Sequence, residues 1–141
     1  MHKSQHHDTY AGCDTSKDTI DVSRYSNEHT AHRRFANTAP GHQYLIAWLN
    51  KPAHPVRVVV EASGIYSLDL ALALHQADSI DVMVANPRAL KDYRCAHMQR
   101  SKTDKVDATI ICDYALRMPF MSWQPPWRCS RFNRLPAASR P

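Results

Sequence analysis

The stretch that decides the fold is Val56-Arg57-Val58-Val59-Val60-Glu61. Three consecutive valines between turn-forming segments predict a strand that is buried on both of its faces. A strand covered on both sides is typical of α/β proteins, in which helices pack on the two faces of one sheet. The stretch also ends in a carboxylate, Glu61, at the carboxyl end of the predicted strand.

The segments around this strand alternate strand and helix patterns. Further strands are predicted at residues 9–14, 19–25, 29–35 and 80–85. Helices are predicted at 38–50, 67–77 and 102–116, and another begins at Pro87, where a first-turn proline belongs. This order predicts an α/β fold with a mixed sheet, in which three antiparallel strands are followed by two parallel strands and helices cover both faces.

Length and charge bear on how the chain is organised. Its 141 residues have the size of one domain with a tail, and its net charge of +5 suggests a nucleic-acid partner. However, no acidic residue follows Asp113, and the five arginines beyond it account for the whole excess. We therefore expect a flexible leader (1–8), a folded domain without net charge (9–118) and an irregular tail rich in Pro and Arg (119–141).

The tail has two interpretations. It is either a basic arm that folds on nucleic acid, with Trp123 and Trp127 able to stack on bases, or the product of out-of-frame translation in a longer gene. The leader is polar and no run approaches the ~18 apolar residues of a membrane span. These features argue against a membrane protein and against a secreted one, so the expected location is the cytoplasm.

Four acidic residues form the candidate site. If strands 9–14 and 56–61 are parallel neighbours, Asp14 and Glu61 meet at their carboxyl ends, where open α/β sheets bind ligands. Asp104 and Asp107 are three residues apart, so on a helix they share one face. Converging carboxylates suit a hard divalent cation such as Mg²⁺ or Mn²⁺, and two such ions support phosphodiester chemistry. The alternative is that these acids are ordinary turn residues and a solvated first helical turn.

Several short motifs, in order and at suitable separations, resemble those of one family. They are Gly12-Cys13-Asp14-Thr15-Ser16-Lys17, Ile20-Asp21-Val22, Phe35-Ala36-Asn37, Val59-Val60-Glu61-Ala62-Ser63-Gly64 with Tyr66, Ala85-Asn86-Pro87 and Ser101-Lys102-Thr103-Asp104-Lys105-Val106-Asp107-Ala108. Over residues 10–120 the chain resembles the N-terminal domain of the DEDD transposases of the insertion sequence one-ten family, relatives of the Piv DNA invertase.

The resemblance implies an RNase H-like domain of the RuvC type, whose catalytic and metal-binding acids would be Asp14, Glu61, Asp104 and Asp107, with two Mg²⁺ or Mn²⁺ ions. Its DNA would be contacted by basic residues near the acids: Lys17, Arg88, Arg100, Lys102 and Lys105. Family members also carry a C-terminal domain with a serine nucleophile, several use a structured guide RNA, and homo-oligomers are expected. On this basis the chain is expected to be a truncated or frameshifted transposase, inactive alone, and this favours the out-of-frame interpretation of the tail.

Two other functions compete with a recombining enzyme. The chain could be a non-catalytic fragment that binds nucleic acid or regulates a full-length transposase, since such a fragment would also keep the acids. Actin-like ATPases and sugar kinases share the RNase H-like core, but they need glycine-rich phosphate loops. The three glycines, Gly12, Gly41 and Gly64, form no such loop.

Overall fold

Three antiparallel strands form the first half of a five-stranded sheet. The computed structural model describes residues 9–52, 55–97 and 106–126, and its first elements are β1 (Thr9–Thr15), β2 (Thr19–Ser26) and β3 (His29–Ala36). Only Asn27 and Glu28 lie between β2 and β3, and both have positive φ angles. Such two-residue turns match the right-handed twist of an antiparallel pair.

Two parallel strands complete the sheet. β4 (Val56–Glu61) pairs with β1, and β5 (Ile80–Ala85) pairs with β4, which places the strands in the order β3-β2-β1-β4-β5. The three central valines of β4 have no exposed surface, because helices cover both faces of the sheet. The predicted mixed sheet is confirmed, and strands 56–61 and 80–85 have the predicted bounds.

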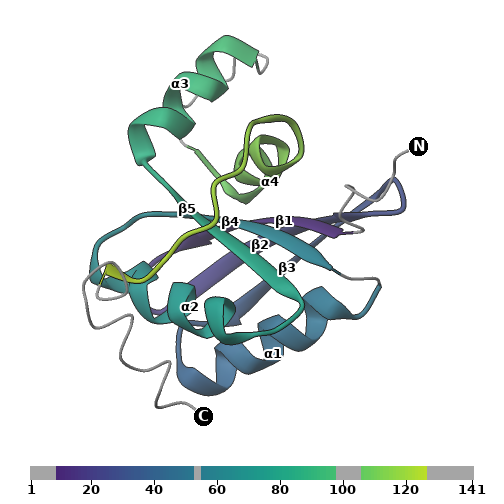
Figure 1. Ribbon diagram of the computed structural model, residues 1–141, viewed down its shortest axis with the longest axis vertical. Coiled ribbons are helices and arrows are strands. Elements are labelled where there is room, and N and C mark those ends of the chain that lie inside the picture. Colours follow the sequence, from purple (N-terminus) through teal and green to yellow (C-terminus); the bar gives the residue numbers. More distant parts are fainter. Residues whose placement is uncertain (1–8, 53–54, 98–105, 127–141) are drawn as a thin grey trace, which may run out of the picture.

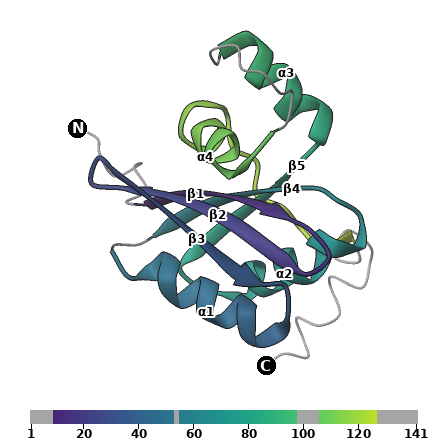
Figure 2. The same ribbon diagram turned by 180° about the vertical axis from the view of Figure 1, so that it is seen from behind.

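The helices divide into two layers. α1 (Ala39–Asn50) and α2 (Ile65–Gln76) lie on one side of the sheet, whereas α4 (Ala108–Arg117) lies on the other, with α3 (Pro87–His97) beyond it (Figures 1 and 2). α1 begins as predicted, since Thr38 Oγ1 accepts a hydrogen bond from the Gly41 N–H at 3.1 Å. No helix in the described residues is long and apolar enough to cross a membrane.

The last helix begins later than predicted. A continuous helix over 102–116 is wrong, because Val106 and Asp107 are not helical and α4 starts at Ala108. The reason is that Asp107 caps the helix: its Oδ1 accepts a hydrogen bond from the Ile110 N–H at 3.1 Å. Asp107 is therefore the cap of α4 rather than a residue on its face, and Asp104, with the rest of 98–105, lies outside the described residues.

The chain after α4 packs along the sheet. Residues 118–125 have no regular secondary structure, and Trp123 and Phe120 pack against the two apolar clusters of the domain. The Trp123 N–H donates a hydrogen bond to the Val82 carbonyl at 2.7 Å, and the Trp123 ring meets His75 edge to face. Trp123 is thus a packing residue of the domain rather than a base-stacking side chain, whereas Trp127 lies outside the described residues.

Candidate functional site

Asp14 and Glu61 lie at the carboxyl ends of adjacent parallel strands. Cys13 of β1 lies opposite Val60 of β4, so the next residue on each strand carries an acid. Both acidic residues are half-buried, and each interacts with other groups of the protein. The structure therefore brings together the two acids that the sequence placed at these strand ends.

A third carboxylate extends this row across the sheet. Asp21 of β2 lies directly opposite Asp14, and its Oδ1 accepts a hydrogen bond from Arg34 Nε of β3 at 2.7 Å. Paired residues on neighbouring strands project from the same face. Asp21 is thus a neighbour of the candidate site, and Arg34 compensates its charge.

Gly12 lets α4 lie directly on β1. A Cβ atom at Gly12 would lie 2.2 Å from the backbone nitrogen of Cys112 and 2.8 Å from the carbonyl oxygen of Ala108. The Cys112 thiol also reaches back to the Tyr10 carbonyl oxygen, at 3.7 Å. α4 therefore packs directly on the backbone of β1, with its first turn against Gly12, two residues before Asp14.

This role of Gly12 was missed by sequence reasoning. The available signal was a glycine inside a strand, which often marks the close approach of another backbone. Because side chains alternate along a strand, Asp14 projects from the same face as Gly12, toward α4. Glu61 likewise shares a face with Val59, which packs in the core beneath α4.

Asp107 reaches this face from the N-terminus of α4. It lines an open hollow of about 410 Å³ between α4 and strands β2 and β3. Asp21, the partner of Asp14, lines the same hollow. The remaining lining residues are Val22, His32, Arg33, Arg34, Ala108 and Thr109. The start of α4 and the strand end of β1 are thus held on one face of the sheet.

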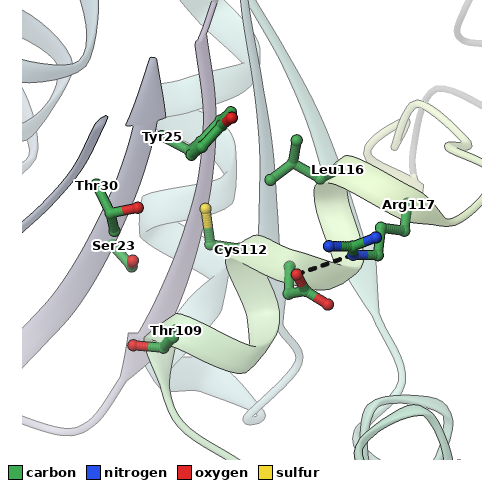
Figure 3. Close-up of a pocket in the computed structure, with 8 residues that line it drawn as sticks. Ser23, Tyr25, Thr30, Thr109, Cys112, Leu116 and Arg117 are labelled. Atoms are coloured by element: carbon green, nitrogen blue, oxygen red, sulfur yellow. Dashed lines mark hydrogen bonds and ion pairs between the residues drawn. The ribbon is translucent and has the colours of Figure 1, made fainter. Parts of the chain in front are cut away.

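A second hollow continues along α4. Its volume is about 240 Å³, and it shares Thr109 with the first (Figure 3). Figure 3 shows strand residues Ser23, Tyr25 and Thr30 on one side and α4 residues Thr109, Cys112, Leu116 and Arg117 on the other. Asp113 also lines the hollow, and its Oδ1 lies 3.0 Å from Arg117 Nε. Burial raises the pKa of the Cys112 thiol to about 12, so this cysteine stays protonated and does not act as a nucleophile near neutral pH.

Two of the five predicted DNA-contacting residues are described, and both lie near the acids. Lys17 is exposed in the turn that follows β1. Arg88 is exposed in the first turn of α3, just after β5, whose last residue Ala85 pairs with Glu61. The two cations therefore lie at the carboxyl edge of the sheet, and the other three residues, Arg100, Lys102 and Lys105, lie outside the described residues.

The described acids have the ligand chemistry of a divalent-cation site, but by themselves they do not form one. Asp14, Glu61 and Asp107 supply carboxylate oxygens, the ligands that Mg²⁺ and Mn²⁺ prefer. The cradle at Gly12, which a Cβ would fill, lets the helix that carries Asp107 approach the strand that carries Asp14. Within the described residues, no three His, Cys, Asp or Glu side chains form a group that could hold a metal, and the fourth predicted acid, Asp104, lies outside them.

The sheet order, the position of the acids and the helix laid across β1 define an RNase H-like domain of the RuvC type. The structure is similar to Thermus thermophilus RuvC, solved in complex with a Holliday junction substrate, with a TM-score of 0.54 and 12% sequence identity. The similarity covers 82% of this chain and 99% of that chain. This chain therefore shares the fold of RuvC over nearly the whole length of the solved RuvC chain.

The chain belongs to the DEDD transposase family of the IS110 type. The family model, described as a transposase, matches residues 11–128. Two curated relatives, the pilin gene-inverting proteins of Moraxella bovis and Moraxella lacunata, are each 30% identical over 122 residues. The matched segment is 83% of this chain but only 37% of each relative, so the chain spans little more than a third of their length.

Proposed function

We propose that this chain is the metal-dependent catalytic domain of a DNA transposase, which cuts and rejoins phosphodiester bonds. The observation that carries the proposal is the register of β1 and β4, which brings Asp14 and Glu61 side by side at the sheet edge that α4 approaches over Gly12. Neighbouring carboxylates at this edge repel one another unless a cation compensates them. Membership of the transposase family supports the same conclusion.

In this proposal Asp14, Glu61, Asp104 and Asp107 hold two Mg²⁺ or Mn²⁺ ions. Bound there, the ions would activate an oxygen nucleophile and stabilise the leaving oxygen. The chain itself supplies the orientation of the carboxylates: strand pairing fixes Asp14 and Glu61, and the helix cap fixes one oxygen of Asp107. Because Oδ1 accepts the capping hydrogen bond, Oδ2 would be the oxygen of Asp107 that binds an ion.

The DNA strand would be held by cations around the acidic edge. Lys17 follows β1 and Arg88 follows β5, and the proposal adds Arg100, Lys102 and Lys105 from the segment that carries Asp104. Each phosphate contact releases counterions and strengthens binding in a salt-dependent way. A cluster of acids alone would repel DNA, so these cations are needed to bring a phosphate to the metal ions.

The whole recombination reaction needs more than these residues in our proposal. The curated relatives are much longer than the matched segment, and a complete transposase would bring a serine nucleophile, a guide RNA and self-association. Residues 1–141 alone are therefore expected to bind metal, to bind DNA weakly and to show little or no strand transfer. The expected location is the cytoplasm. Efficient strand transfer by these residues alone would contradict this part of the proposal.

Paramagnetic Mn²⁺ tests the metal site. In ¹⁵N-labelled protein, low concentrations of Mn²⁺ should broaden the amide signals of residues around Asp14, Glu61, Asp104 and Asp107 together. Asp14→Asn should abolish that broadening. The matched control is Asp78→Asn, which removes an exposed acid just before β5, at the opposite edge of the sheet, and should leave the broadening unchanged. Broadening scattered over the surface would show that the acids are not a site.

A cleavage assay separates a catalytic domain from a fragment that only binds or regulates. With Mg²⁺ and labelled DNA, slow nicking that disappears in Asp14→Ala supports the catalytic proposal. DNA binding that is unaffected by Asp14→Ala, without nicking under any metal condition, favours the non-catalytic alternative.

A further inference from the structure

Asn37, between β3 and α1, makes four hydrogen bonds at the acidic edge of the sheet. Its backbone N–H donates to the Asp18 carbonyl at 2.9 Å. Its side-chain Nδ2 donates to two further carbonyl oxygens, that of Ser16 at 2.8 Å and that of Tyr66 at 2.9 Å. Its Oδ1 lies 2.7 Å from Nε2 of His42. One residue thus uses all of its side-chain hydrogen-bonding groups on three different segments.

The orientation of this amide is fixed by its partners. Both hydrogens of Nδ2 face carbonyl oxygens, which can only accept, so Oδ1 must face the histidine. His42 Nε2 must then carry a proton and donate it to Oδ1. His42 is only 4% exposed, and burial lowers its pKa, so near neutral pH the ring is neutral with its proton on Nε2. The imidazole therefore holds the amide in one orientation.

The segments joined by Asn37 are those that follow the two acids. Ser16 and Asp18 belong to the turn after β1, which carries Asp14. Tyr66 is in the first turn of α2, which follows Glu61 of β4. A second link joins the same segments, since Thr15 Oγ1 and Ser63 Oγ lie 2.7 Å apart. The pairing of β1 with β4 ends at Cys13 and Val60, and beyond these residues the polar contacts of Asn37 and of Thr15 with Ser63 connect the two segments.

We propose that Asn37 is a positioning residue of the metal site, which holds the strand ends of Asp14 and Glu61 at a fixed separation and is itself oriented by His42. The inference rests on the proposed function, because it assigns Asn37 a role toward metal ligands. Two carboxylates that bind one ion must stay close despite their mutual repulsion, so a tie between their strand ends lowers the cost of assembling the site. Asn suits this position because it offers two donors and one acceptor in a plane, whereas Asp offers no donor.

The test compares Asn37→Ala with Asn50→Ala. Asn50 is also half-buried and also joins two segments, through a 2.8 Å hydrogen bond from Ser79 Oγ, but it lies at the opposite edge of the sheet. Mn²⁺ affinity is measured from the free-ion electron paramagnetic resonance signal, and urea unfolding reports stability. Asn37→Ala should weaken Mn²⁺ binding about 10-fold, as loss of groups supporting metal ligands commonly does, while Asn50→Ala should leave it within twofold of wild type.

A second variant keeps the test decisive if Asn37→Ala fails to fold. Asn37→Asp keeps the shape and the backbone hydrogen bond but removes both side-chain donors, and it should also weaken Mn²⁺ binding despite its added negative charge. His42→Gln keeps a donor for Oδ1 and should retain most of the affinity. Without metal, the amide shifts of Asp14 and Glu61 should move in Asn37→Asp but not in Asn50→Ala.

The outcomes separate this inference from the function on which it rests. Wild-type protein that binds no Mn²⁺ at Asp14 and Glu61 overturns the proposed function, and the inference with it. Wild-type binding at those acids, with Asn37→Asp and Asn37→Ala within twofold of it, overturns the inference alone. Equal losses in the Asn37 and Asn50 variants overturn it as well, because they would reflect general destabilisation.

Discussion

On the face covered by α1 and α2, large aliphatic side chains fill the space between helices and sheet, whereas on the face covered by α4 the helix lies directly on the strand backbone. In the described residues the first face holds a cluster of fourteen buried core residues and the second a cluster of five. The second face is also the one on which α4 covers Gly12 and from which the Asp14 side chain projects. The candidate site therefore lies on the face with less apolar packing.

This difference indicates two ways of fixing a helix on a sheet. α2 is held by buried side chains such as Leu70 and Leu74, which contribute through the apolar area they remove from water. α4 buries Ile111 and Ala115 as well, but its backbone also lies directly on β1, which is possible because Gly12 has no Cβ. The second arrangement leaves polar hollows beside the helix, in which a substrate or metal ligand has room. The following variants test that contrast, from the largest expected effect to the smallest.

Leu74→Ala should cause the largest loss of stability. Leu74 has no exposed surface and packs in the larger core, so the variant leaves a cavity between α2 and the sheet. We expect the free energy of unfolding to fall by about 4 kcal/mol, within the range for buried leucines. Urea unfolding measures the loss, and the amide shifts of α4 should stay unchanged. Shifts that move in α4 would show that the two faces are not independent.

Gly12→Ala should cost about 3 kcal/mol, toward the upper end of what overpacking costs, and should act on the other face. The added methyl group would collide with the backbone of Cys112 and Ala108, so α4 must move away from β1. The amide shifts of α4 should change while those of α2 stay unchanged, and the affinity for Mn²⁺ should fall. The comparison variant is Gly64→Ala, which meets no atom within 4 Å and is strained only by its φ of 65°. Equal effects of the two substitutions on α4 would contradict the close-approach argument.

Local sequence patterns predicted the parts of the fold that depend on neighbours along the chain. The valine run of β4 and the helix start at residue 38 are such features, and the structure confirms both. The start of α4 was predicted wrongly, because the spacing of its apolar residues continues past the point where Asp107 caps the helix. The packing of Trp123 was missed as well, since it depends on β5, about forty residues earlier.

The candidate site divides in the same way. The placement of Asp14 and Glu61 just after the last paired residues of β1 and β4 followed from two predicted strands and one assumption, that they are parallel neighbours, which the structure confirms. Gly12 and Asn37 occur in the family motifs, but the sequence assigned neither of them a structural role. Gly12 meets a helix about a hundred residues away, and Asn37 joins three segments, so neither role has a periodic signature in the sequence.

Asp107 distinguishes the stabilising role of an acid from its proposed role toward metal. Asp107→Ala removes the cap of α4 and should lower the free energy of unfolding by about 1 kcal/mol. Asp107→Asn keeps a capping oxygen and should lower the free energy of unfolding by only about 0.3 kcal/mol. Both variants should nevertheless weaken Mn²⁺ binding. Urea unfolding and Mn²⁺ titration of the two variants give the comparison. If Asp107→Asn binds Mn²⁺ as well as wild type, Asp107 serves α4 alone.

The ion pair of Arg34 with Asp21 should contribute least to stability, although it lies in the same row of the sheet as Asp14. The side chains are 68% and 45% exposed, and exposed pairs contribute about 0–1 kcal/mol because water and salt screen them. Arg34→Gln should therefore change urea unfolding by less than about 0.5 kcal/mol, and by still less in 1 M NaCl. The same substitution leaves Asp21 uncompensated beside Asp14, which should tighten Mn²⁺ binding at low salt, since the added negative potential attracts the cation. A large loss of stability with no change in Mn²⁺ affinity would contradict this prediction. It would mean that the pair of Arg34 with Asp21 stabilises the fold and has no influence on metal binding at Asp14.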